Sequence, residues 1–320
     1  MSQVARGHPP RRARKAAIGL GQGAVGSLLA AVATALPESL IPVVAIIGGG
    51  SGSEDVAVGA IIGAPLLLAT IAMALVGLGA LLYRDRRESG LSLDVHRPTL
   101  ERDLGFFMAC FSVGLLLLLG LGAPAAVRIP AAVVLVIAYT VYARWTLRNS
   151  GSVEEEEELR PLVLDSTRGD PPTMGIVVLQ LVVALGAIVG GAHLFVEQVL
   201  SVAEDAGLEP LVLSLVLAPF ATELPEKANS FFWIREGKDS LALGNITGAL
   251  VFQSTLPMAV GLAFTSWELD SYSLVAGCLA LAGGLVAILT LQVRRRFNGR
   301  AIALWAALYV AFVVYVVSTA

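Results

Sequence analysis

Two short stretches, Thr34-Ala-Leu-Pro-Glu38 and Thr222-Glu-Leu-Pro-Glu226, are the most informative part of this chain, because each places a proline and a carboxylate inside a long apolar run. Each is followed, at nearly the same distance, by a second matching segment, AVGAIIGA at 57–64 and ALGNITGA at 242–249. Two matches in the same order are typical of an internal repeat. We therefore predict that the two halves of the chain share one architecture.

The sequence around these stretches is far too apolar for a soluble protein. Of its 320 residues, 56% are hydrophobic and only 15% are charged, whereas soluble domains carry about 25% charged residues. The charged residues gather between apolar runs long enough to cross a bilayer. Nine such runs lie at 16–47, 56–82, 104–122, 127–143, 174–196, 210–234, 240–264, 271–293 and 301–318. We predict an all-α integral membrane protein with nine transmembrane helices, with the lipid bilayer as a partner and no nucleic acid.

The connectors between the runs predict the orientation in the membrane. Lys and Arg gather before the first run and after the second, fourth, sixth and eighth, whereas the other side carries Glu54, Asp55, Glu204, Asp205, Glu209, Glu268 and Asp270. Because basic connectors stay cytoplasmic, we predict a cytoplasmic N-terminus and an external C-terminus in the plasma membrane. The two Pro-Glu stretches then cross in opposite directions, and such inverted repeats are typical of secondary transporters. As an alternative, the basic start followed by Ala31-Val-Ala33 is similar to a secretory signal, but its recurrence later in the chain argues against cleavage.

An acidic segment divides the chain into two membrane parts. Glu154 to Glu158 and three nearby prolines interrupt the apolar pattern. We predict a basic cytoplasmic N-terminus at 1–15, a first membrane repeat at 16–147, a cytoplasmic linker at 148–173 and a second membrane repeat at 174–320. Four of the predicted helices then belong to the first repeat and five to the second.

The Pro-Glu pairs carry the expected chemistry. Each proline lacks an N–H, so we expect broken helices that free the carbonyl groups of Ala33 and Ala221. A carboxylate at this depth costs at least about 2.5–3.5 kcal/mol and is therefore functional by default. If the two repeats face each other, Glu38 and Glu226 form a cage of oxygens suited to a hard cation such as Ca²⁺ or Na⁺.

Two further charges lie inside the run that holds Glu226. Lys227 follows Glu223 by four residues, so the two can neutralise each other on one helix. Alternatively, Glu223 carries protons, or all these groups form a polar cluster that only holds helices together. Four glycines at a spacing of four residues predict close helix packing: Gly59, Gly63, Gly244 and Gly248.

At these residues the chain resembles the sodium/calcium exchanger superfamily of cation antiporters. That family carries Thr-Ser-x-Pro-Glu followed by Gly-Asn-x-x-Gly-Ser-Asn in each of two α-repeats, and the second half of this chain is the more similar one. The resemblance implies that Glu38 and Glu226 bind Ca²⁺. It further implies neighbouring oxygen donors at Thr34, Thr222, Asn245 and Gln253.

The chain also departs from the family pattern. The motif serine is Ala35 in the first copy and Glu223 in the second, and the first copy has Ala60 and Leu68 where the second keeps Asn245 and Gln253. Most oxygens therefore come from the second repeat. The added Glu and Lys indicate that a proton or a tethered ammonium replaces an ion. The family also has five spans per half, so the one lacking here would precede residue 16.

The function that we predict is secondary-active antiport of cations by alternating access. Ca²⁺ is the expected substrate, exchanged against Na⁺ or H⁺, and the partners are inorganic cations. The alternatives are proton-coupled exchange through Glu223 and a non-transporting membrane protein that kept the exchanger fold. No motif for an enzyme or for a bound cofactor is found, and oligomeric state is not predicted.

Overall fold

The computed structural model describes residues 36–93, 95, 97–119, 124–149, 163–164, 173–268, 270–294 and 296–319. The regular structure of these residues is helical throughout: α2 (Leu36–Gly48), α3 (Ser53–Leu67), η2 (Leu68–Ala72), α4 (Met73–Leu82), α5 (Arg97–Leu119), α6 (Ala125–Asn149), α7 (Met174–Ala206), α8 (Pro210–Arg235), α9 (Asp239–Gln253), α10 (Leu256–Phe264), α11 (Ser271–Ala287), η3 (Ile288–Arg294) and α12 (Gly299–Thr319). The prediction of an all-helical fold is confirmed.

Many of these helices are long and apolar enough to cross a membrane. Within the described residues, six segments qualify by length and hydropathy: Ser53–Leu82, Ala125–Thr146, Met174–Ala206, Asp239–Phe264, Ser271–Leu291 and Gly299–Thr319. Helix α8 has 26 residues and carries Glu223, Glu226 and Lys227 in its middle. Because charge is costly in hydrocarbon, a helix of this kind must hold those residues in the protein interior.

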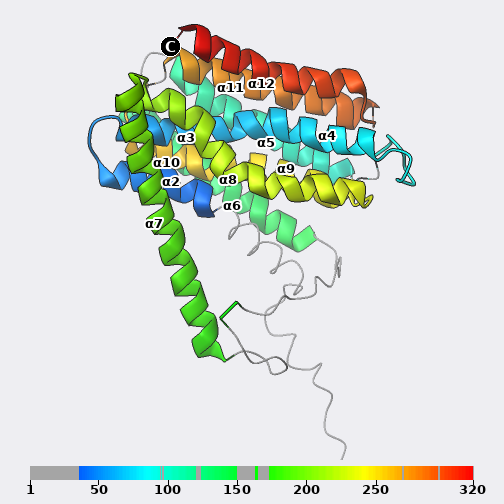
Figure 1. Ribbon diagram of the computed structural model, residues 1–320, viewed down its shortest axis with the longest axis horizontal. Coiled ribbons are helices and arrows are strands. Elements are labelled where there is room, and N and C mark those ends of the chain that lie inside the picture. Colours follow the sequence, from blue (N-terminus) through cyan, green and yellow to red (C-terminus); the bar gives the residue numbers. More distant parts are fainter. Residues whose placement is uncertain are drawn as a thin grey trace, which may run out of the picture.

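The rod formed by α3, η2 and α4 lies at the centre of the structure. Its most apolar window is 83% buried by other helices, whereas that of α7 is 0% buried. Helix α3 packs against α2, α8 and α11, while α5 packs against α9, and α12 covers α4 and α11. Helix α7 crosses the other helices, and its N-terminal half extends beyond them (Figure 1). The carboxylates are therefore positioned mainly by α2, α3 and α8.

Glycines bring α3 and α8 into backbone contact. A Cβ atom on Gly59 would lie 2.7 Å from the carbonyl oxygen of Leu211, and one on Gly63 would overlap the carbonyl oxygen of Leu215. Only glycine permits this approach. Around the repeat-related Gly244 and Gly248, no other heavy atom of the described residues lies within 4 Å of such a Cβ position, so the described helices do not pack closely there.

The helices are interrupted at other places than we predicted. Helix α8 continues from Pro210 to Arg235 through Pro225, so the expected break at this proline is wrong. One missing N–H removes a single hydrogen bond, and the bonds on either side maintain the helix. Irregular turns occur instead in the following helices, as the π-helical turn Leu68–Ala72 and as the turn between α9 and α10. Pro37 lies in the first described turn of α2.

Basic and acidic connectors gather at opposite ends of the bundle. At one end, Arg87 after α4 lies 2.8 Å from the carboxylate of Asp239 at the start of α9. The connector before α12 joins them there, since the N–H of Phe297 donates to the carbonyl of Leu91. At the other end, the carboxylate of Glu54 accepts a hydrogen bond from the N–H of Ser266. Among the described residues, the two connectors rich in Arg after α4 and before α12 therefore lie together.

Candidate cation-binding site

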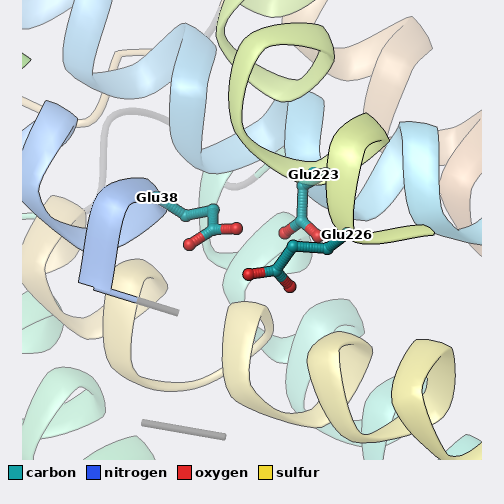
Figure 2. A group of neighbouring side chains, drawn as sticks. All are labelled: Glu38, Glu223 and Glu226. Atoms are coloured by element: carbon teal, nitrogen blue, oxygen red, sulfur yellow. The ribbon is translucent and has the colours of Figure 1, made fainter. Parts of the chain in front are cut away.

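Three carboxylates from two helices meet inside the bundle. Glu38 extends from the first turn of α2, and Glu223 and Glu226 extend from α8. Each offers one oxygen, and these oxygens lie within 4.8 Å of one another. Figure 2 shows the three side chains directed toward one common point. Glu38 and Glu223 are only 6% and 1% exposed, whereas the side chain of Glu226 is 24% exposed, so two of the three carboxylates are buried and the third is partly buried.

A lysine lies within the same cluster. The ammonium nitrogen of Lys227 is 3.3 Å from Oε2 of Glu223 and 3.4 Å from Oε2 of Glu226. The side chain of Lys227 is 1% exposed, as is that of Glu223. In the described part of the chain, Oε2 of Glu38 is buried and has no hydrogen-bond partner. A buried carboxylate oxygen needs a compensating partner, and a bound cation would provide one.

Polar side chains of α9 contact the cluster or the helix that carries it. The amide nitrogen of Gln253 donates to Oε1 of Glu223 at 2.9 Å. The amide nitrogen of Asn245 donates instead to the hydroxyl of Ser230 on α8 at 2.9 Å. Gln253 therefore orients a carboxylate directly, whereas Asn245 joins α9 to α8.

A cavity of about 230 Å³ lies beside the two Pro-Glu motifs, between α2, α7 and α8. Pro37, Ala221 and Thr222 line it, together with apolar residues of α7 such as Phe195. The Thr222 hydroxyl donates to the carbonyl of Ala218 at 3.0 Å, so its oxygen keeps free lone pairs for a cation. The predicted donors Ala33 and Thr34 lie outside the described residues.

One buried carboxylate near α9 was not identified from the sequence. Asp103 on α5 is 3% exposed and accepts hydrogen bonds from Tyr142 at 2.6 Å and Thr247 at 3.0 Å. Arg102 lies 2.8 Å from the same carboxylate. Asp103 directly precedes the predicted run at 104–122, so its position indicated a solvated connector. It instead fixes α9, the helix of Asn245 and Gln253, to α5 and α6.

The buried ion pair of Arg87 and Asp239 was also missed. The side chains of both residues are 0% exposed, and Arg87 also donates to the carbonyl of Ile234 at 2.6 Å. Both residues stand in stretches that read as solvated connectors, and they are 152 positions apart. No local signal in the sequence pairs them. This ion pair fixes the connector after α4 to the junction of α8 and α9.

Comparisons with known proteins agree with this architecture. The putative antiporter CaxA of Alkalimonas amylolytica is 33% identical over 125 residues, which are 37% of this chain and 38% of that relative. The chain thus matches less than half of the length of this relative.

Solved structures extend the likeness over most of the chain. The H⁺/Ca²⁺ exchanger CAX has a TM-score of 0.63 at 20% identity, over 88% of this chain and 70% of CAX. The sodium-calcium exchanger NCX_Mj has a TM-score of 0.57 at 18% identity, over 92% of this chain and 88% of NCX_Mj. At these identities the likeness shows a shared fold. The model of the family described as sodium/calcium exchanger protein matches residues 12–148 and 176–318. Because this match covers most of the sequence, the chain belongs to the sodium/calcium exchanger family of multi-pass membrane proteins.

Proposed function

We propose that this protein is a secondary-active antiporter that exchanges Ca²⁺ against Na⁺ or H⁺ by alternating access. The observation that carries the proposal is the group of Glu38, Glu223 and Glu226, whose carboxylate oxygens lie within 4.8 Å of one another. Buried carboxylates at this spacing repel one another unless cations compensate them. The exchangers CAX and NCX_Mj, which share the fold, support an ion as the cargo.

In this proposal Glu38 and Glu226 are the central ligands. Ca²⁺ takes six to eight oxygens at about 2.3–2.6 Å, so carboxylates alone do not complete its shell. Thr222 precedes Glu226 by about one helical turn, and Ala221 and Thr222 line the adjoining cavity, so the hydroxyl of Thr222 and the carbonyl of Ala221 are further donors. Their counterparts in the first repeat are Thr34 and Ala33. The oxygens of Asn245 and Gln253, with water, complete the set.

The repeat symmetry supports alternating access. Helix α2 packs on α3 as α8 packs on α9, which fits two copies of one unit in inverted orientation with nine membrane helices in all. The end of the bundle where Arg87 and the connector before α12 lie has an excess of positive charge. Because positively charged connectors stay inside, this end faces the cytoplasm. The N-terminus is then cytoplasmic and the C-terminus external, in the plasma membrane, with the repeats at 16–147 and 174–320 joined by the linker 148–173.

The counter-ion is Na⁺ or H⁺, and one observation favours H⁺. Glu223 stands where the family motif has a serine, and it is 1% exposed beside Lys227. The replacement adds a carboxylate, a group that can bind and release protons, where the family motif has a hydroxyl. Proton-coupled exchange through Glu223 is therefore the second form of the proposed function.

Flux into proteoliposomes tests the proposal. Purified protein is reconstituted, and ⁴⁵Ca²⁺ uptake is followed under an outward gradient of Na⁺ or of H⁺. Glu38→Gln and Glu226→Gln should each abolish uptake, because glutamine keeps the shape and removes the charge. Glu204→Gln, at an exposed position near the end of α7, is the matched control and should transport normally. Undiminished uptake by either site variant would refute the assignment.

A further inference from the structure

We propose that Lys227 is a permanent internal cation that sets the net charge of the site, so that one divalent cation exchanges for two monovalent cations without net charge movement. This inference rests on the proposed function. It concerns the coupling ratio, which the carboxylates alone do not determine.

The side chain of Lys227 is buried inside the site. It is 1% exposed, and its ammonium lies between Glu223 and Glu226 at 3.3 Å and 3.4 Å. Glu223 is held from its other side by the amide of Gln253. Moving the ammonium away would leave a buried charge without its partners, which is strongly unfavourable. The positive charge therefore stays with the protein while ions come and go.

The net charge of the cluster determines how many cations neutralise it. Glu38, Glu223 and Glu226 carry three negative charges when ionised, and Lys227 carries one positive charge, which leaves a net charge of −2. One Ca²⁺ brings the site to zero, and so do two Na⁺ or two H⁺. Both loaded states are then neutral. The transmembrane potential performs no work on a neutral site that moves between the two faces of the membrane.

Substitutions of Glu223 and Lys227 change the net charge of the site. The new charge predicts whether the membrane potential raises or lowers the accumulation of Ca²⁺. Lys227→Met leaves the empty site with a net charge of −3, so the site is neutral with three monovalent cations and carries one negative charge with Ca²⁺. Glu223→Gln leaves −1, so the site is neutral with one monovalent cation and carries one positive charge with Ca²⁺. One elementary charge across 100 mV corresponds to about 2.3 kcal/mol, or about 50-fold in an ion gradient at equilibrium.

The experiment measures Ca²⁺ accumulation at equilibrium in proteoliposomes. The membrane potential is set by K⁺ and valinomycin to zero or to 100 mV, inside negative, at a fixed gradient of Na⁺ or of H⁺. For the wild type we expect the same accumulation ratio at both potentials. For Lys227→Met the internal Ca²⁺ should fall about 50-fold, and for Glu223→Gln it should rise by the same factor. The double variant Glu223→Gln/Lys227→Met restores −2 and should lose the dependence on potential.

The outcomes separate the inference from the function on which it rests. Ca²⁺ uptake by the wild type that responds to the potential would overturn the fixed charge of Lys227 and leave antiport intact. Absence of uptake by folded wild type under either gradient would overturn antiport and the inference together. If Lys227→Met does not fold, Glu223→Gln and the double variant decide the question, because they differ by one charge. Equal responses of these two variants to the potential would refute the inference.

Discussion

The contact between α3 and α8 allows a sharp test, because the repeat supplies its own control. A Cβ atom on Gly63 would lie 2.8 Å from Cγ of Pro219 and 3.0 Å from the carbonyl carbon of Leu215. Neither a proline ring nor helix backbone can move aside easily. Gly248 occupies the related position of the second repeat, where no heavy atom of any other described helix lies within 4 Å. With respect to the described helices, alanine should therefore be harmful at position 63 and tolerated at position 248.

The expected difference follows from two opposing effects. Overpacking a close contact costs about 1–3 kcal/mol, while alanine is favoured over glycine inside a helix by roughly 0.5–1 kcal/mol. The second effect is common to both sites and cancels when Gly63→Ala is compared with Gly248→Ala. The Gly63 variant should then be less stable by about 1–3 kcal/mol. The assay is unfolding by sodium dodecyl sulfate in mixed micelles, followed by circular dichroism, and equal stability of the two variants would refute the packing argument.

Three further predictions concern other contacts. Arg87→Met removes the guanidinium that lies 2.8 Å from the carboxylate of Asp239, a residue whose side chain is 0% exposed, and should cost about 3–5 kcal/mol in the same titration. Arg84→Met, at a side chain that is 57% exposed, is its control and should change stability by less than about 0.5 kcal/mol; similar losses from both would contradict a buried ion pair. Asp103→Asn should lower the free energy of unfolding by about 1–3 kcal/mol, and Thr247→Val should lower it by about 1 kcal/mol. Because the two residues share one hydrogen bond, the double variant should lose less than the sum of the two. Full additivity would contradict that contact. Ca²⁺ at 100 times its dissociation constant should stabilise the wild type by about 2.7 kcal/mol and leave Glu38→Gln unaffected, whereas equal stabilisation of the variant would place the ion elsewhere.

The helical architecture could be predicted from the sequence because it depends on local composition. Apolar runs bordered by charged connectors locate helices one at a time, and α7, α11 and α12 lie close to the predicted runs. The repeat also indicated which carboxylates to examine. Two helices that carry the same Pro-Glu motif do bring Glu38 and Glu226 into one cluster.

The remaining features depend on contacts between distant segments. Pro225 removes a single backbone hydrogen bond, and α8 continues through it, so the proline alone does not determine whether the helix breaks. The pairing of Arg87 with Asp239 spans 152 positions, and hydropathy counts each residue without its partner. Asp103 and Gln253 acquire their roles only when α5 and α9 are placed beside other helices. Sequence patterns locate a charge along the chain, but only the tertiary structure shows whether it is paired or solvated.

Equilibrium binding of ⁴⁵Ca²⁺ to the purified protein reports on the carboxylate cluster itself, since it requires neither a gradient nor a complete transport cycle. We expect one Ca²⁺ per chain, displaced by an excess of Na⁺ or by lower pH. Binding should disappear in Glu38→Gln and Glu226→Gln and persist in Glu204→Gln. Stoichiometric binding that survives the loss of both Glu38 and Glu226 would show that the cluster of carboxylates between α2 and α8 is not the cation site.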